Sequence, residues 1–133
     1  VDENGKKVVQ LVSGNKYTIY SKAVFYEPVK VASAGFSINN TTGLILYGVT
    51  SMLQNQVSYE VLKGEIIETR VSVQMWLTNG AYFLTVSMAD PFAEVDVQYD
   101  RRLDALQFDI VPKDGIFTTS IVDLNESLSV IRM

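Results

Sequence analysis

Positions suited to a buried face alternate with positions suited to an outward face along much of the chain, most regularly between residues 82 and 88. One set, Tyr82, Leu84, Val86 and Met88, alternates there with a second set, Phe83, Thr85 and Ser87. A period of two residues predicts a β-strand that buries one face and leaves the other face available. Residues 17–26, 34–39, 65–77 and 106–111 follow the same period. The pattern therefore predicts a protein built from half-buried strands.

Turn signals separate these segments from several shorter ones. We interpret residues 8–12, 44–48 and 116–122 as further strands, 29–31 as a short edge piece, and 95–99 as part of a loop or hairpin arm. Residues 49–63 form an excursion that could hold a short helix. Asn125 could cap a short terminal helix, or residues 127–133 could add a strand. Roughly eight short strands with turns between them favour an all-β antiparallel sandwich of two sheets.

The corner before residue 82 has the form Leu77-x-x-Gly80-x-Tyr82. In β-sandwiches, a tyrosine at such a corner places its ring in the core and returns its hydroxyl to the backbone a few residues upstream. Asn79 and Gly80 suit the turn because both tolerate positive φ. We therefore expect Tyr82 to tie one strand of the sandwich to the corner that leads into it.

Composition narrows the classes of function. The chain has 133 residues and is 47% hydrophobic, which fits one domain spanning residues 1–133 with a polar linker at residues 1–5. Its net charge is −4 with scattered Lys and Arg, which argues against nucleic acid as a partner. It has no apolar run long enough for a membrane-spanning helix.

The sequence also lacks the residues that carry the commonest catalytic and metal chemistry. It contains no His and no Cys, so it has no Ser-His-Asp triad, thiolate nucleophile or zinc-finger ligand set. No Gly-x-x-x-x-Gly-Lys-[Ser/Thr] loop for ATP is present. One acidic region comprises Asp90, Glu94, Asp96, Asp100 and Asp104, whose spacing matches no calcium loop. We expect a non-enzymatic domain without cofactor or metal.

Five signals follow one another along the chain: Phe36-Ser37-Ile38, the turn glycine Gly43, a strand after Gly64, the corner Leu77-Thr78-Asn79-Gly80-Ala81-Tyr82, and the final Leu106-Gln107-Phe108-Asp109-Ile110-Val111. Their order resembles the C-terminal domain of Wzt-type proteins, the ATP-binding subunits of bacterial ABC exporters for O-antigen polysaccharide. The resemblance covers residues 6–122.

The resemblance implies an immunoglobulin-like sandwich that binds the finished polysaccharide before export. It further implies a homodimer in the cytoplasm, peripheral to the inner membrane through the transporter. The partners would be an upstream nucleotide-binding domain and the membrane subunit of the exporter. The tail, residues 116–133, is the candidate for a strand exchanged between protomers.

Two outward faces offer the aromatic rings and planar polar groups that bind sugars. The face that we call the Trp76 face comprises Tyr20, Lys22, Arg70, Ser72, Gln74 and Trp76. The alternative, called here the Phe83 face, comprises Ser37, Asn39, Tyr47, Phe83, Thr85, Gln107 and Asp109. The Trp76 face holds the only tryptophan and is the first choice. Trp76 could instead close the end of the core or lie in a dimer interface.

Two functions follow from these faces. The first is a non-catalytic domain that recruits an exported glycan to its transporter. The alternative is an immunoglobulin-like module whose faces or free strand edges bind another protein. A hydrolase is disfavoured because the chain has neither His nor Cys.

Overall fold

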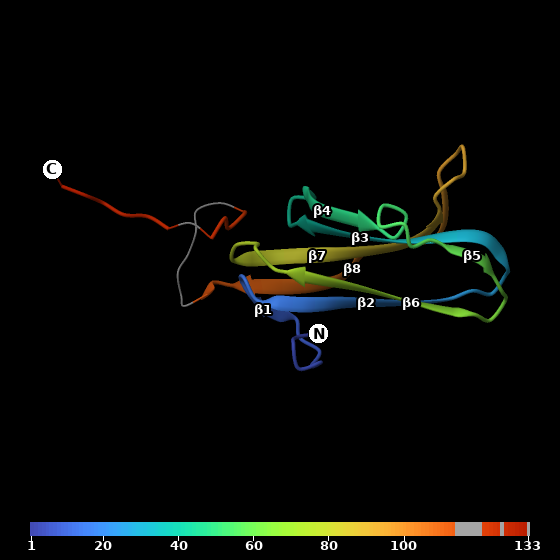
Figure 1. The fold of residues 1–133 in the computed structure, drawn as a ribbon, viewed down its shortest axis with the longest axis horizontal. Coiled ribbons are helices and arrows are strands. Elements are labelled where there is room, and N and C mark those ends of the chain that lie inside the picture. Colours follow the sequence, from blue (N-terminus) through green and yellow to red (C-terminus); the bar gives the residue numbers. More distant parts are fainter. Residues whose placement is uncertain (114–120, 126, 133) are drawn as a thin grey trace.

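The described residues of the computed structural model are 1–113, 121–125 and 127–132, and they form eight strands and no helix (Figure 1). The strands are β1 (Gln10–Val12), β2 (Lys16–Val24), β3 (Val29–Asn40), β4 (Ile45–Thr50), β5 (Ser58–Val61), β6 (Ile66–Gln74), β7 (Gly80–Asp90) and β8 (Val97–Val111). The predicted all-β sandwich of two sheets is confirmed. Within these residues, no helix has the length and apolar character needed to cross a membrane.

The two sheets differ greatly in width. The wide sheet has six strands in the order β1-β8-β7-β3-β4, with β5 paired to β3. The narrow sheet contains only β2 and β6. All pairs are antiparallel except β1 with β8, which is parallel. The narrow sheet lies along the wide one, and the apolar faces meet between them (Figure 1).

The core forms from alternate residues on the facing sides of the two sheets. Its main cluster comprises Leu11, Tyr17, Phe36, Ile38, Met75, Tyr82, Leu84, Phe108 and Ile110. A second cluster comprises Phe25, Ala32, Ala34, Val61 and Met88. In the segment 17–26, the period of two assigns Tyr17, Ile19, Ala23 and Phe25 to one face, and all four pack in or against these clusters. The period-two pattern therefore identified the buried face of this strand correctly.

The predicted tyrosine corner is also confirmed. Tyr82 is 4% exposed, and its hydroxyl donates a 2.7 Å hydrogen bond to the carbonyl of Thr78. Its ring stacks on Phe108 with 5.8 Å between the ring centroids. Gly80 takes a positive φ of 150° at the turn. The bond satisfies a buried hydroxyl and fixes the path of the chain into β7.

Three segments differ from the prediction. Residues 29–31 and 34–39 belong to one strand, β3, and not to two. Its first part pairs with β5 alone, and its later part pairs with β4 and β7. Its alternation is hidden because six consecutive residues are buried. On the outward side, Ser33 Oγ accepts from Met52 N at 3.1 Å, so the turn after β4 covers this part of β3.

The other two differences concern β5 and β8. Residues 49–63 contain the end of β4, a turn and β5, whereas a short helix was considered there. Residues 97–111 form one continuous strand, although a loop or hairpin arm was expected around 95–99. An irregularity in the middle of β8 breaks its alternation, which concealed the continuity.

The ends of the chain also pair with the sandwich. Val1 and Thr18 exchange two main-chain hydrogen bonds of 2.8 and 3.0 Å, and the linker assignment of residues 1–5 stays a prediction. The strand predicted at 116–122 lies mostly outside the described residues. Its end is described: Val122 bridges Leu77 in antiparallel fashion, and Thr78 N donates to Ile121 O at 2.8 Å. Beyond this bridge the chain extends away from the sandwich, and residues 127–132 have neither helix nor strand (Figure 1).

Candidate functional site

The register of the wide sheet brings outward side chains of three strands into one row. Asn39 of β3 is opposite Phe83 of β7, and Phe83 is opposite Gln107 of β8. Directly opposite residues share a face and have Cβ atoms about 5 Å apart. The ring of Phe83 therefore lies between two amide side chains. Phe83 and Asn39 are half-buried, whereas Gln107 is exposed.

The rest of the Phe83 face lies around this row, with one exception. Ser37 is opposite Thr85 in the next row of β3 and β7, and Asp109 follows Gln107 by two residues along β8. Tyr47 is opposite Ile38, a core residue, beside a register shift in β4. Tyr47 is therefore set apart from the outward rows.

A bulge in β8 adds a residue that the sequence did not assign to this face. Leu84 pairs with Leu106 and Val86 with Arg102, so residues 103–105 of β8 are opposite only Thr85. Asp104, at the centre of the bulge, takes a positive φ of 49°. Its N–H donates to Thr85 Oγ1 at 3.1 Å, and its Oδ1 accepts from Asn39 Nδ2 at 3.2 Å.

From the sequence, Asp104 was assigned only to an acidic region whose spacing matches no calcium loop. The sequence gives no signal for a bulge of this kind. In the structure its carboxylate lies beside the Asn39–Phe83–Gln107 row. Among the described residues, no three His, Cys, Asp or Glu side chains come together as a metal site.

Four residues of the Trp76 face come together on the narrow sheet, on the side away from the wide sheet: Tyr20, Lys22, Arg70 and Ser72. Tyr20 is opposite Arg70, and the guanidinium of Arg70 lies 5.1 Å from the centre of the Tyr20 ring. Arg70 Nη2 is also 2.7 Å from Glu68 Oε2, and Lys22 Nζ is 3.8 Å from Glu68 Oε1. The hydrogen bond and negative charge of Glu68 raise the pKa of Arg70. On this face, Arg70 therefore contacts the Tyr20 ring, and both Arg70 and Lys22 pair with Glu68.

Trp76 and Gln74 are directed toward the turn between β1 and β2. A Cβ placed on Gly14 would lie 2.7 Å from Cζ3 of Trp76, so the indole packs directly on the glycine backbone. Gln74 Nε2 donates to Gly14 O at 3.0 Å. Trp76 lies beyond the last residue of β6 and is partly buried. It belongs to the end of the sandwich, which was one of the alternatives for this residue.

The chain is similar to known proteins in both sequence and fold. The family model of the Wzt C-terminal domain matches residues 1–124. Among the solved structures that match is a crystal structure of the C-terminal domain of wzt, at 22% sequence identity and a TM-score of 0.79. The match covers 92% of this chain and 74% of that chain, and it shows a shared fold. The comparison with curated proteins gave no match.

Proposed function

This chain belongs to the Wzt C-terminal domain family, and from that premise we propose that it binds O-antigen polysaccharide without catalysis and recruits it to an ABC exporter. The domain would act beside a nucleotide-binding domain and a membrane subunit. It would work in the cytoplasm, at the inner membrane. Binding in place of hydrolysis agrees with a sequence that has neither His nor Cys.

The observation that carries this proposal is the row formed by Asn39, Phe83 and Gln107. An aromatic ring can stack on the apolar C–H side of a sugar, while flanking amides reach the hydroxyl groups. The row crosses three adjacent strands, so its spacing is fixed by the ladder of the wide sheet. A rigid platform needs little ordering on binding, which favours affinity.

The Phe83 face supports this role better than the Trp76 face. On the narrow sheet, Arg70 already covers Tyr20 and is bound to Glu68. The indole of Trp76 is packed against Gly14. A glycan on that face would have to displace these contacts, whereas the side chain of Gln107 makes no hydrogen bond to another described residue.

We further propose that the domain is a homodimer in which the tail beyond residue 116 exchanges between protomers. Four of its described apolar side chains, Leu124, Leu128, Val130 and Ile131, are each at least 78% exposed, whereas Ile121 packs against the core and Val122 is 55% exposed. A run of exposed apolar residues is unusual for a monomer and favours cover by another chain. Because the family resemblance implies a homodimer, we take this other chain to be a second copy of the domain.

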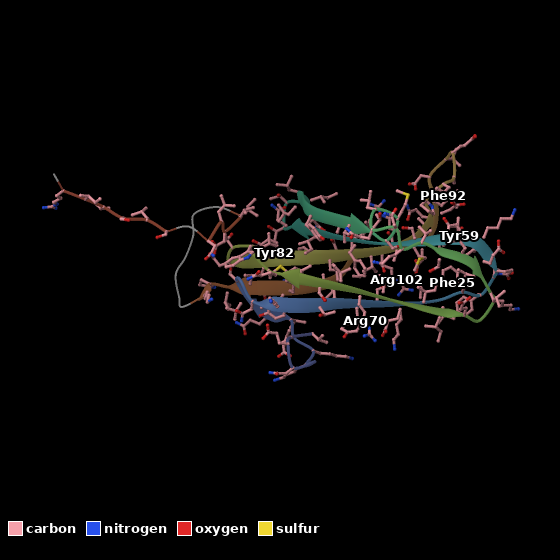
Figure 2. All side chains as sticks on the ribbon, in the orientation of Figure 1. Phe25, Tyr59, Arg70, Tyr82, Phe92 and Arg102 are labelled. Carbon is pink, nitrogen blue, oxygen red and sulfur yellow. The ribbon has the colours of Figure 1, made fainter. Side chains whose placement is uncertain are left out.

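The proposal can be tested by titrating the ¹⁵N-labelled domain with O-polysaccharide released from the lipopolysaccharide of the source strain. We expect amide shifts at Asn39, Phe83 and Gln107, and about tenfold weaker binding after Phe83→Ala, because one stacking platform is lost. Phe92→Ala is the matched control, since Phe92 is 59% exposed on the turn between β7 and β8 (Figure 2). An absence of shifts would overturn the proposal, and shifts confined to Tyr20 and Arg70 would move the site to the narrow sheet.

One observation favours the second candidate, a protein-interaction module. A cleft of about 750 Å³ opens between β2 and the first half of β8, and both strands have a free edge there within the described residues. A peptide strand could add to either edge by main-chain hydrogen bonds. Retention of the upstream nucleotide-binding domain on the immobilised domain, without any response to polysaccharide, would favour this function.

A further inference from the structure

We propose that the Phe83 face selects neutral sugar residues over acidic ones, and that Asp104 sets this preference. The inference rests on the proposed function and adds the class of sugar that the face accepts. Asp104 would act in two ways. It would position the amide of Asn39, and it would repel a sugar carboxylate.

The first part follows from the hydrogen bonds of Asn39. Its Nδ2 donates to Asp104 Oδ1 at 3.2 Å and to Asn40 O at 3.3 Å. An amide nitrogen has two N–H donors, so these bonds occupy both of them. The group left for a ligand is Oδ1, which only accepts. Asn39 therefore suits a sugar hydroxyl, which can donate, and offers nothing to a carboxylate, which cannot.

The position of the Asp104 carboxylate is fixed by its own backbone. A positive φ of 49° is uncommon for a residue with a side chain, although Asp tolerates it better than most. The N–H of Asp104 is held by Thr85 Oγ1, and Thr85 is only 8% exposed. The bulge therefore holds the carboxylate against Asn39, where a charged ligand would meet it.

The charge around the row points the same way. Asp109 adds a second carboxylate on the same face, two residues from Gln107. The strands β3, β7 and β8 carry three cationic residues, Lys30, Arg101 and Arg102. Lys30 lies nine residues from Asn39 along β3, and Arg102 is paired with Asp100 at 3.2 Å.

Arg101 is the remaining cation, and it is opposite Ser87, four residues along β7 from Phe83. At the rise of a β-strand this separation is about 13 Å. A sugar stacked on Phe83 would therefore meet carboxylates and acceptors before it met a free cation. The carboxylates of Asp104 and Asp109 would repel a sugar carboxylate at this face and weaken its binding. A sugar hydroxyl carries no charge and can donate to the acceptor oxygens there.

The test uses methyl glycosides of glucose, galactose and mannose, each paired with the corresponding uronate, titrated into the ¹⁵N-labelled protein. We expect the neutral sugars to shift Asn39, Phe83 and Gln107, and each uronate to bind about fivefold more weakly than its neutral partner. Asp104→Asn keeps the size and the tolerance of positive φ but removes the charge. The difference in affinity between each neutral sugar and its uronate, called here the gap, should therefore fall below about twofold. Asp96→Asn, an exposed change on the turn before β8, should leave the gap unchanged.

A second variant tests whether the effect of Asp104→Asn comes from the lost charge or from a distortion caused by the new amide. Asp104→Gly adopts the same backbone without strain and removes the carboxylate altogether, so it should also narrow the gap. Uronates that bind as tightly as neutral sugars, or a gap that both variants preserve, would overturn the inference and leave the proposed function standing. If neither the neutral glycosides nor the O-polysaccharide shift any residue, both proposals fail.

Discussion

The hydroxyl of Tyr82 lies 2.7 Å from the carbonyl oxygen of Thr78 and donates a hydrogen bond to it. This bond spans the corner between the narrow and the wide sheet. The same tyrosine ring stacks on Phe108, and Phe108 lies one residue from Gln107 of the candidate site. A single side chain therefore connects the corner, the core and the strand that carries Gln107, one end of the Asn39–Phe83–Gln107 row.

Replacing Tyr82 with Phe keeps the ring and removes only the hydroxyl. We expect a loss of about 1–2 kcal/mol in the free energy of unfolding, since the buried bond to Thr78 disappears. Urea denaturation followed by tryptophan fluorescence measures it. Tyr26→Phe is the matched control, because Tyr26 is 78% exposed, and it should change stability by less than about 0.5 kcal/mol. Equal effects from the two variants would contradict the role of the corner.

Gly14 should be far less tolerant of alanine than Gly43. Both have positive φ, +85° and +86°, but only Gly14 would place its Cβ against the indole of Trp76, at 2.7 Å. Gly43→Ala should cost about 1 kcal/mol from backbone strain alone, and Gly14→Ala about 2–4 kcal/mol because steric overlap is added. Thermal unfolding measures both changes.

A double-mutant cycle separates the two causes at Gly14. In a Trp76→Ala background, the cost of Gly14→Ala should fall to that of Gly43→Ala, since the overlap is relieved while the strain persists. An undiminished cost in that background would show that the indole is not the cause.

Removal of the exposed tail should abolish self-association. A chain ending at Asp123 keeps the bridge of Val122 to Leu77 but lacks the four exposed apolar side chains beyond it. Sedimentation equilibrium should give a dimer for the full chain and a monomer for the shortened one. Leu62→Ser, on the loop between β5 and β6, removes another exposed leucine and should leave the dimer intact. A monomeric full chain would contradict the proposed exchange.

Stability should fall in alkali partly through Tyr99. Burial raises the pKa of Tyr99 above its ordinary value of 10.0, and the carboxylate of Asp90 adds to the shift. Below pH 10 the phenol is neutral in both the folded and unfolded states, so its contribution is complete. Above pH 10 the unfolded chain ionises first, and stability declines as the pH rises through the raised pKa.

Tyr99→Phe should therefore give a shallower loss of stability above pH 10 than the unmodified protein. The variant also loses the 2.8 Å bond from Tyr99 to Val31 O, which lowers stability by a constant amount. Urea midpoints between pH 7 and 9 measure this constant, and those between pH 10 and 11 measure the slope. Identical slopes above pH 10 would contradict the shift.

The sequence predicted those elements that expose exactly one face. The strand β6 alternates strictly and β2 nearly so, because the core covers one side and solvent the other. The strand β7 alternates in its sequence, although Thr85 on its outward side is buried. The corner at Tyr82 was predictable because a short motif specifies it. In contrast, β3 was divided in two, since a turn covers its outward side and a run of buried residues replaces the alternation.

The candidate site was predictable in part for the same reason. Asn39, Phe83 and Gln107 were assigned to one face from their parity along three strands. Asp104 was not assigned to this face, because the bulge in β8 changes which residues of the strand point outward. The bulge is defined by the pairing with β7, which the local sequence does not show. The orientation of Trp76 depends on Gly14, some sixty residues earlier, and no local pattern encodes that contact.

The unequal width of the two sheets has a consequence for how relatives of this domain can diverge. Outward positions on the six-stranded sheet contribute little to the packing between the layers, yet the ladder keeps them at constant intervals. Substitutions there can change the outward surface while the framework and its folding stay the same. Under the proposed function, family members that bind chemically different polymers would share one scaffold and differ mainly in the outward side chains of the wide sheet.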